Sequence, residues 1–197
     1  MNQNQHRVQC GVWGLAAMLL ILPMLVPASK GQDSRGQRVS KANSTRRVAL
    51  VIGNAAYTEA PLKNPVNDAR DMAAALREMG FEVTELHNQN FEQMETAIQT
   101  FGQRLSGGGA GLFYFAGHGV QTKDNQNYLI PVGGTITAEN VKYRAVNVGE
   151  LTEQMQAAQN GINLIILDAC RNNPWRGLRS GARGLAAMDA PKGTLIA

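Results

Sequence analysis

LIILDACRNNPW, residues 164–175, runs from four aliphatic side chains into Asp168 and Cys170 and then into a polar loop that contains Pro174. A short apolar run bounded by loop residues is typical of a strand that is buried on both faces of a sheet. The stretch therefore predicts a buried strand over residues 162–170 whose carboxyl end carries an acid and a thiol.

The rest of the chain alternates between runs typical of strands and runs typical of amphipathic helices. A helix is expected where apolar residues recur every three or four positions, and a buried strand where a short apolar run meets turn residues. By these criteria strands are expected at residues 48–54, 81–86, 111–117 and 162–170, and helices at residues 64–80, 90–105 and 148–161. Strands that alternate with helices pair in parallel through right-handed crossovers. We therefore expect an α/β fold, a three-layer α/β/α sandwich around a mostly parallel sheet.

Two segments depart from this alternation. Residues 120–147 are longer and less regular, and we expect an elaborated surface loop that contains a short strand at NYLIPV, residues 127–132. The last five residues, GTLIA, are typical of the opening of a further strand. We therefore expect the C-terminal part of the fold to be missing from this sequence.

The N-terminal residues have the three parts of a secretory signal peptide. Residues 1–9 are polar with one Arg, residues 10–26 are almost wholly apolar, and small residues lead up to Ala28. Such a segment is removed on export. We expect a signal peptide at residues 1–28, a flexible polar linker at residues 29–45, and a periplasmic or extracellular protein with no membrane span after cleavage. An uncleaved N-terminal membrane anchor is the alternative.

Composition and motifs argue against several classes of function. The net charge is only +4 and the basic residues form small groups, so we expect no nucleic-acid partner. The sequence has no G-x-x-x-x-G-K-[ST] motif, and its GGGAG run precedes a strand instead of opening a helix, which argues against nucleotide binding. No set of Cys and His has the spacing of metal ligands, so we expect no metal and no other cofactor.

The cysteine count isolates one thiol. The chain has two cysteines, and Cys10 lies in the expected signal peptide, so cleavage leaves Cys170 alone. A single Cys in an exported protein is either a partner in an intermolecular disulfide or a reactive thiol.

Polar residues follow two of the expected strands at the same edge of the sheet. His118 lies between Gly117 and Gly119 directly after one apolar strand, and Cys170 ends another. Because the carboxyl ends of parallel strands form the ligand-binding edge of such sheets, we expect His118 and Cys170 to face each other across a crevice. An imidazole can generate a thiolate nucleophile, and the N–H groups of Gly119 and Cys170 can hold an oxyanion. The two glycines are expected to keep the approach to His118 open. A buried structural Cys and a structural His are the alternatives.

The motifs around these residues resemble those of a known family. GLFYFAGHG and LIILDACRNNP are similar to the caspase superfamily, peptidase family C14, and most of all to its bacterial metacaspase- and paracaspase-like members, the orthocaspases. The resemblance covers residues 46–197 and includes RVALVIGNAAY and LKNPVNDARDMAAALREMGF. It implies a caspase-like (caspase-hemoglobinase) peptidase domain at residues 46–197. It also implies a cysteine-type endopeptidase with His118 and Cys170 as the catalytic dyad and the amides of Gly119 and Cys170 as the oxyanion hole.

Two acidic residues bear on the substrate that the resemblance implies. Caspases that cut after Asp have Gln two positions before the nucleophile, whereas metacaspase-like proteins have an acid there, and this chain has Asp168. Asp68 falls where the metacaspase pattern supplies a second acid. Two carboxylates around one pocket favour a guanidinium or ammonium group, so we expect protein or peptide substrates cut after Arg or Lys. The alternatives are a first-turn helix residue for Asp68 and a hydrogen-bonded strand-end residue for Asp168.

The resemblance leaves three points open. A catalytically silent, caspase-like interaction module would have the same fold, although the intact His and Cys argue against it. Some relatives depend on calcium, which no pattern in this sequence indicates. Metacaspases often have His after the nucleophile, where this chain has Arg171, whose charge would either lower the pKa of the thiol or pair with an acid.

Overall fold

The computed structural model describes residues 46–106, 108–170 and 185–197, with Cys170 described by its backbone. The expected signal peptide and linker lie outside the described residues, as does Arg171. In chain order the described elements are β1 (Arg47–Gly53), α1 (Pro65–Glu78), β2 (Glu82–His87), α2 (Phe91–Leu105), β3 (Ala110–Gln121), β4 (Asn127–Leu129), α3 (Val141–Arg144), β5 (Val146–Asn147), α4 (Val148–Ala157), β6 (Ile162–Cys170) and β7 (Thr194–Ile196).

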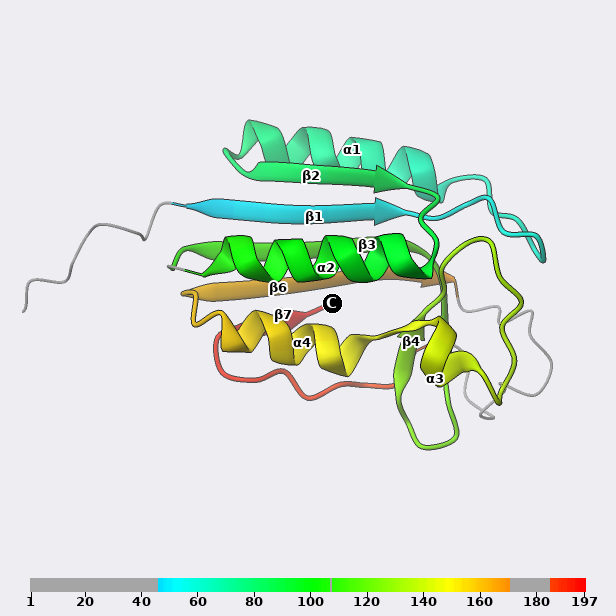
Figure 1. Ribbon diagram of the computed structural model, residues 1–197. Helices are drawn as coiled ribbons and strands as arrows, with labels where there is room; N and C mark the ends of the chain where they lie inside the picture. Colours follow the sequence, from blue (N-terminus) through cyan, green and yellow to red (C-terminus); the bar gives the residue numbers. More distant parts are fainter. Residues whose placement is uncertain (1–45, 107, 171–184) are drawn as a thin grey trace, which may run out of the picture. The chain divides into compact units, whose positions relative to one another are not determined.

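The main sheet is parallel and has the strand order β2-β1-β3-β6-β7 (Figure 1). Its central strand, β3, pairs with β1 as far as Ala116 and with β6 as far as His118. From Gly119 onward β3 pairs instead with β4, which is antiparallel and pairs in turn with β5. His118 therefore lies where the chain passes from the parallel sheet into a small antiparallel one.

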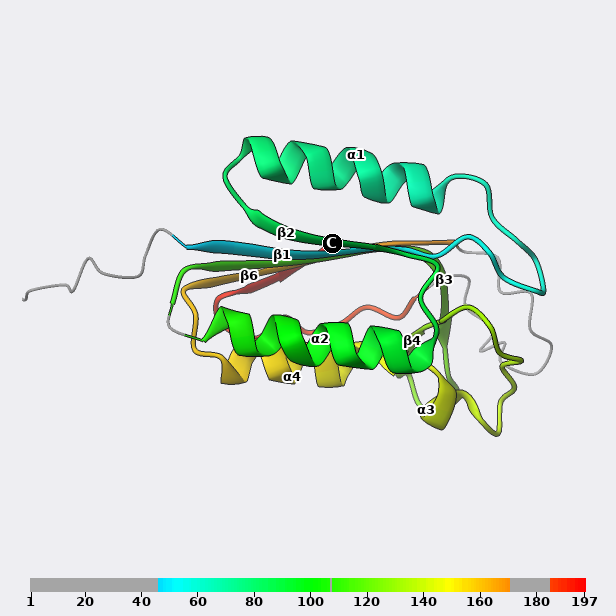
Figure 2. The same ribbon diagram turned by 45° about the horizontal axis from the view of Figure 1, so that its top comes forward.

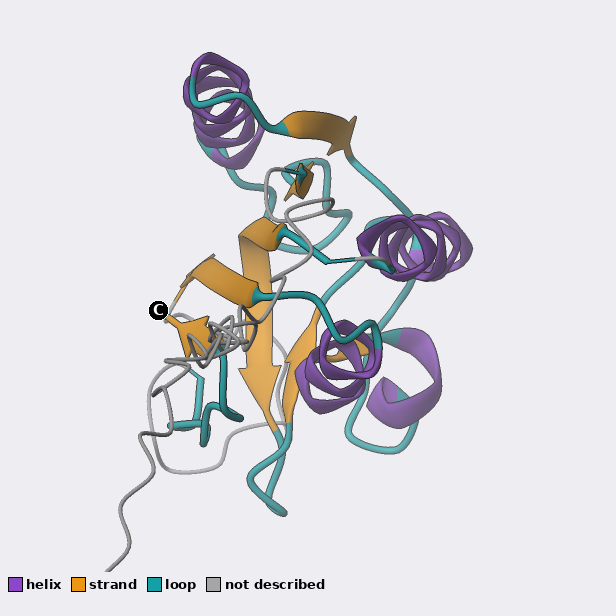
Figure 3. Cartoon of the chain, turned by 90° about the vertical axis from the view of Figure 1, so that its left-hand side faces the viewer, coloured by secondary structure: helices purple, strands orange, loops and turns teal. Residues whose placement is uncertain are grey.

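Helices cover both faces of the main sheet, which confirms the predicted α/β architecture (Figures 2 and 3). α2 and α4 pack against one face of β1, β3 and β6, and α1 packs against the other face. The largest fully buried side chains on the α2–α4 side include Phe113 and Phe115, which alternate along β3 with residues of the α1 side. A central strand that is buried on both faces reads as a continuous apolar run, and this is why the run at residues 111–117 could be assigned from sequence.

α1 lies close to the carboxyl end of β1 because small residues line their contact. A Cβ added to Gly53 would lie 2.7 Å from the Cβ of Ala69 and would also collide with the carbonyl group of Pro65. Pro65 suits the first turn of a helix, where its missing N–H leaves no backbone bond unmade. The close packing places the first turn of α1, which includes Asp68, beside the edge where the parallel strands end.

Apart from the short strand expected at residues 127–132, two predicted element ends differ from the structure by more than two residues. β3 extends to Gln121, beyond the expected end at Gly117, because Gly119 to Gln121 pair with β4. The helix expected at residues 148–161 ends at Ala157, and Gln159 has a φ of 51° in the turn toward β6.

The segment expected to be a surface loop, residues 120–147, is a packed structure instead. It contains β4, α3 and β5, and the predicted short strand is found in part, as β4. It builds an apolar cluster with residues of the β1–α1 connection: Tyr57, Val120, Tyr128, Ile130, Ile136, Val141 and Ala145. The prediction of a loop failed because each apolar run there is short, and the runs bury one another only after the chain has folded. The further strand expected at the chain end is present as β7, which pairs with β6.

Among the described residues, no helix combines the length and apolar character that a membrane crossing requires.

Candidate active site

The register of β3 and β6 brings together the two residues expected to carry the chemistry. The two strands are parallel neighbours, and His118 is the register partner of Cys170 at the end of their pairing. Neighbouring strands lie about 4.8 Å apart, so the backbones of both residues reach the same point of the sheet edge. The side chain of Cys170 lies outside the described part of the structure.

A backbone carbonyl fixes the protonation of the His118 ring. The side chain is only 3% exposed, and its Nε2 lies 2.8 Å from the carbonyl oxygen of Ala60. A carbonyl can only accept, so Nε2 donates, and the basic nitrogen of the neutral ring is Nδ1. Ala60 has a φ of 52° in the β1–α1 connection. Sequence analysis did not find Ala60, because any residue type offers the same carbonyl.

Tyr57 holds the backbone of His118 in place. The backbone N–H of His118 donates to Tyr57 Oη at 3.0 Å, and Tyr57 Oη donates to the carbonyl of Ile130, also at 3.0 Å. The Tyr57 and His118 rings pack with their centroids 4.5 Å apart and their planes tilted by 57°. The phenol is buried and thus links the β1–α1 connection, the His118 position and the segment after β4.

The glycines that flank His118 serve close packing, which corrects the expectation that they keep the approach open. A Cβ on Gly117 would lie 2.6 Å from Tyr57 Oη and 2.8 Å from Phe115 Cζ. A Cβ on Gly119 would lie 2.9 Å from Leu185 Cδ2 and 3.0 Å from Ala169 Cβ. Neighbouring side chains already occupy the space on both sides.

We expect Gly117→Ala to destabilise the protein by about 1–3 kcal/mol, the usual cost of overpacking a well-packed site. The added methyl group would push Tyr57 off the His118 amide. Urea unfolding measures the loss, and Gly134→Ala is the matched control, because a Cβ on Gly134 meets nothing within 4 Å. Equal stability of the two variants would contradict the packing argument.

Gly119 follows His118, and its backbone N–H points away from β4. It is the register partner of Leu129, and the hydrogen bond beside this pair runs from the N–H of Ile130 to the carbonyl of His118 at 2.9 Å. In an antiparallel ladder such a pair does not exchange hydrogen bonds with each other. The Gly119 N–H therefore takes no part in the β3–β4 ladder and points toward β6, whose last register pair with β3 is Cys170 with His118.

The two predicted acids lie around a buried tyrosine. Tyr114 Oη donates to Asp168 Oδ2 at 3.4 Å, and the Tyr114 side chain is almost fully buried between β1, β6 and α1. Burial first, then the charges of Asp168 and Asp68, raise the pKa of Tyr114 strongly. Asp168 from β6 and Asp68 from α1 thus act on one hydroxyl group, and we call these two residues the acidic pair. Sequence analysis missed Tyr114, although a Tyr in a buried strand signals a hydroxyl that needs a partner.

The acidic pair and His118 lie on the same side of β3. Side chains alternate along a strand, so Tyr114 and His118, four residues apart, point to the α1 face. Asp168 pairs with Ala116, between these two residues in the register. An acidic site and a basic imidazole therefore adjoin one another at the sheet edge.

Burial lowers the pKa of His118, and the hydrogen bond to Ala60 offsets this only in part. The unfolded chain then binds a proton more readily than the folded one. The neutral His118 ring therefore contributes to folding stability above the pKa that His118 has in the unfolded chain, about 6.5. This contribution is lost as the pH falls toward the lower pKa that His118 has in the folded protein.

We expect the free energy of unfolding to decrease as the pH falls below about 6.5. The decrease should be smaller in His118→Gln, whose amide does not titrate and can still donate to the Ala60 carbonyl. Urea unfolding of both proteins between pH 5 and 8 measures the difference. Parallel curves would show that His118 titrates alike in the folded and unfolded states.

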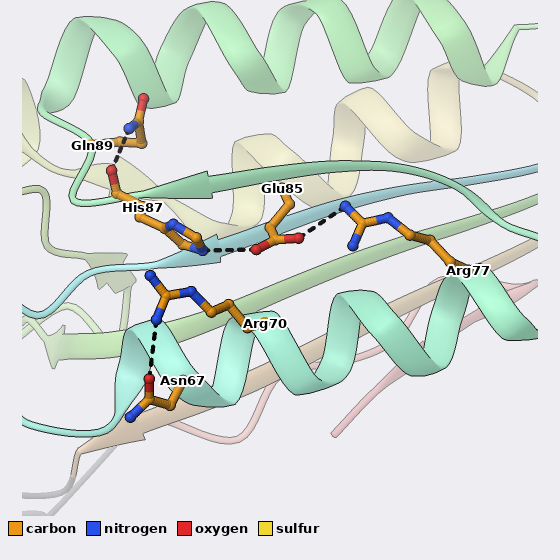
Figure 4. Close-up of polar contacts among 6 residues, drawn as sticks. All are labelled: Asn67, Arg70, Arg77, Glu85, His87 and Gln89. Carbon is orange, nitrogen blue, oxygen red and sulfur yellow. Dashed lines mark hydrogen bonds and ion pairs between the residues drawn. The ribbon is translucent and has the colours of Figure 1, made fainter.

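His87, the other described histidine, belongs to a separate surface network (Figure 4). Its Nε2 lies 3.0 Å from Glu85 Oε1, and Glu85 Oε2 accepts from Arg77 Nη2 at 2.8 Å. The carbonyl of His87 accepts from Gln89 Nε2 at 2.6 Å. Across the described ranges, no group of three or more His, Cys, Asp or Glu side chains could hold a metal ion.

Parts of known proteins are similar in sequence to the domain that contains this site. The family model described as "Caspase domain" matches residues 46–194. The human mucosa-associated lymphoid tissue lymphoma translocation protein 1 is 34% identical over 143 residues, which cover 71% of this chain and 17% of that protein. Its Mus musculus homolog is 35% identical over 144 residues, which cover 71% of this chain and 16% of that protein. The chain thus spans less than a fifth of the length of these curated relatives.

A solved structure is similar in fold. The crystal structure of the Drosophila initiator caspase Dronc superposes with a TM-score of 0.54 at 12% identity and covers 79% of this chain and 55% of that chain. This likeness supports the fold alone, whereas the family match extends over most of the sequence. On that match, the chain belongs to the caspase domain family, peptidase C14.

Proposed function

We propose that this domain is a cysteine-type endopeptidase that cuts protein or peptide substrates after Arg or Lys. The observation that carries the proposal is the register of β3 and β6, in which His118 is the partner of Cys170 at the end of the parallel pairing of these strands. The acidic pair beside Tyr114 supports the basic specificity. Membership of the C14 family of peptidases also supports the proposal.

In the proposed reaction, His118 Nδ1 accepts the thiol proton of Cys170 and the thiolate attacks the scissile carbonyl carbon. The N–H groups of Gly119 and Cys170 hold the oxyanion of the tetrahedral intermediate. The imidazolium then gives its proton to the leaving amine as the C–N bond breaks, which leaves a thioester. Water then attacks the thioester carbon and gives up a proton to His118. The C–S bond breaks to release the carboxylic acid, and the imidazolium returns its proton to the Cys170 thiolate. The Ala60 carbonyl keeps Nε2 protonated throughout and so keeps Nδ1 as the atom that exchanges the proton.

The acidic pair would bind the side chain that precedes the scissile bond. Two carboxylates present acceptors to a guanidinium or ammonium group and repel an Asp side chain. Specificity for a basic residue and discrimination against an acidic one therefore share a single cause.

The experiment compares fluorogenic tetrapeptides that end in Arg, Lys or Asp, with the full chain and a Cys170→Ala control. Cleavage of the Arg and Lys peptides that disappears in the control supports the proposal. Cleavage of the Asp peptide alone would keep the dyad and refute the role of the acidic pair. No cleavage, together with a Cys170 that resists alkylation at neutral pH, would favour an interaction module of the same fold.

Export is a second proposal, carried by the first 28 residues of the sequence. N-terminal sequencing of the protein isolated from the periplasm or the medium tests it. A mature protein that begins after Ala28 supports a cleaved signal peptide, and an intact Met1 in the membrane fraction supports the anchor.

A further inference from the structure

The hydroxyl of Tyr114 is a buried polar group placed between charges from two other elements. The residue is 4% exposed and belongs to the apolar cluster that also contains Ala49 and Val51 of β1 and Ala69 of α1. Its hydroxyl donates to Asp168 Oδ2 at 3.4 Å and lies in the field of Asp68. A buried tyrosine needs a partner for its O–H, and here that partner is one member of the acidic pair.

The direction of this hydrogen bond follows from the charges. A carboxylate accepts and does not donate, so the proton lies on Tyr114 Oη. Loss of that proton would set a third negative charge beside two others, which is why the carboxylates raise the pKa of Tyr114 in addition to its burial. The hydroxyl therefore remains a donor at any pH at which a thiol peptidase works. Asp168 keeps Oδ1 and the remaining acceptor capacity of Oδ2 for a ligand.

We propose that Tyr114 is a specificity-determining positioning residue whose hydroxyl fixes the orientation of the Asp168 carboxylate beside Asp68, so that the acidic pair prefers Arg to Lys. The proposal rests on the function proposed above and deepens it. A guanidinium is planar and binds a carboxylate through two parallel hydrogen bonds, so its binding depends on the plane of that carboxylate. An ammonium group is a compact charge with rotatable donors and tolerates a carboxylate in many orientations.

The chain offers a matched pair of variants. Tyr114→Phe removes the hydroxyl and keeps the ring that packs under α1. Tyr128→Phe is the control: Tyr128 is also 4% exposed, and its Oη also takes part in a hydrogen bond of 3.4 Å, which it accepts from the neutral amide of Asn147 in the β4–β5 sheet. Both variants lose one oxygen atom and one long hydrogen bond, and only one of them loses a bond to the acidic pair.

The first measurement is kcat and KM of the full chain for matched peptides that end in Arg or Lys. For Tyr114→Phe we expect KM for the Arg peptide to rise about tenfold, the usual worth of a hydrogen bond to a charged group, with kcat almost unchanged. KM for the Lys peptide should change by less than about threefold, so the Arg-to-Lys preference in kcat/KM falls. Tyr128→Phe should leave the preference unchanged. An equal loss for both peptides in Tyr114→Phe would overturn the proposal, because a purely structural role predicts it.

The second measurement does not depend on turnover. In the Cys170→Ala chain, calorimetry compares the affinity for butylguanidine, which carries a guanidinium, with that for butylamine, which carries an ammonium on the same alkyl chain. We expect butylguanidine to bind more tightly and Tyr114→Phe to remove most of the difference. A preference for butylguanidine that Tyr114→Phe leaves intact would overturn the role of Tyr114. If that variant loses the preference while no peptide is cut, the proposed peptidase function falls and the assignment of Tyr114 stands.

Discussion

Cys170→Ala and His118→Ala should each lower kcat/KM for an Arg-terminated peptide by at least about 10⁴-fold, the loss seen when members of a catalytic unit are removed. The first variant lacks the nucleophile, and the second lacks the base that generates it. The double variant should be no slower than the worse single variant, because the two residues act in one step. Initial rates at substrate concentrations well below KM measure all three.

The controls for this prediction separate catalysis from folding. His87→Ala removes a histidine from the surface network of Glu85 and Arg77 and should leave kcat/KM unchanged. His118→Gln retains a donor for the Ala60 carbonyl and should be as inactive as His118→Ala, with a smaller loss of stability. Substantial activity in His118→Gln would mean that a group other than His118 accepts the thiol proton.

Asp168→Asn should lower kcat/KM for the Arg peptide by about 10- to 10²-fold, because a hydrogen bond between charged groups contributes roughly 1.5–3 kcal/mol. Asp68→Asn should act in the same direction. Most of the loss should appear in KM if the acidic pair binds substrate and transition state alike. Steady-state kinetics with Arg, Lys and Asp peptides measure both effects, and discrimination against the Asp peptide should weaken in each variant.

Asp71→Asn is the matched control for the acidic pair. Asp71 lies on α1 one turn beyond Asp68, and the charges that act on the Tyr114 hydroxyl come from Asp68 and Asp168. The same change of charge at Asp71 should alter kcat/KM by less than about threefold, as expected of an exposed charge. If Asp71→Asn and Asp168→Asn behave alike, the net charge of the surface and not the acidic pair sets the specificity.

Much of the fold could be predicted because its signals are local. The apolar run at residues 162–170 and the helical spacing at residues 90–105 match β6 and α2 closely. α2 also begins at a capping box formed by Asn90 and Gln93, a signal carried by two residues three apart. The extension of β3 was not predictable, since it depends on pairing with β4 after the chain has turned back.

The residues of the candidate site also fall into those with a local sequence signal and those without one. His118, Cys170 and the two acids could be named because their residue types and positions at strand or helix ends are unusual. Ala60 contributes a carbonyl, which carries no residue signature, and Tyr57 acts on a residue far along the chain. Tyr114 lies in an apolar strand, where the sequence pattern does not distinguish a tyrosine from any other large side chain. Sequence thus reveals the groups that would react, and tertiary contacts reveal the groups that orient them.

The shared strand β3 has a consequence for how the site opens in solution. A residue at the frayed end of a strand exchanges its amide hydrogen with solvent quickly, because only a local opening is needed. The His118 amide is not at such an end: β6 flanks it on one side, the β4 ladder continues beyond it, and Tyr57 Oη accepts its hydrogen. Its exposure requires Tyr57 Oη to leave the His118 N–H, while the same hydroxyl donates to the carbonyl of Ile130. We therefore expect the His118 amide to exchange slowly, although the residue lies at the carboxyl edge of the parallel sheet.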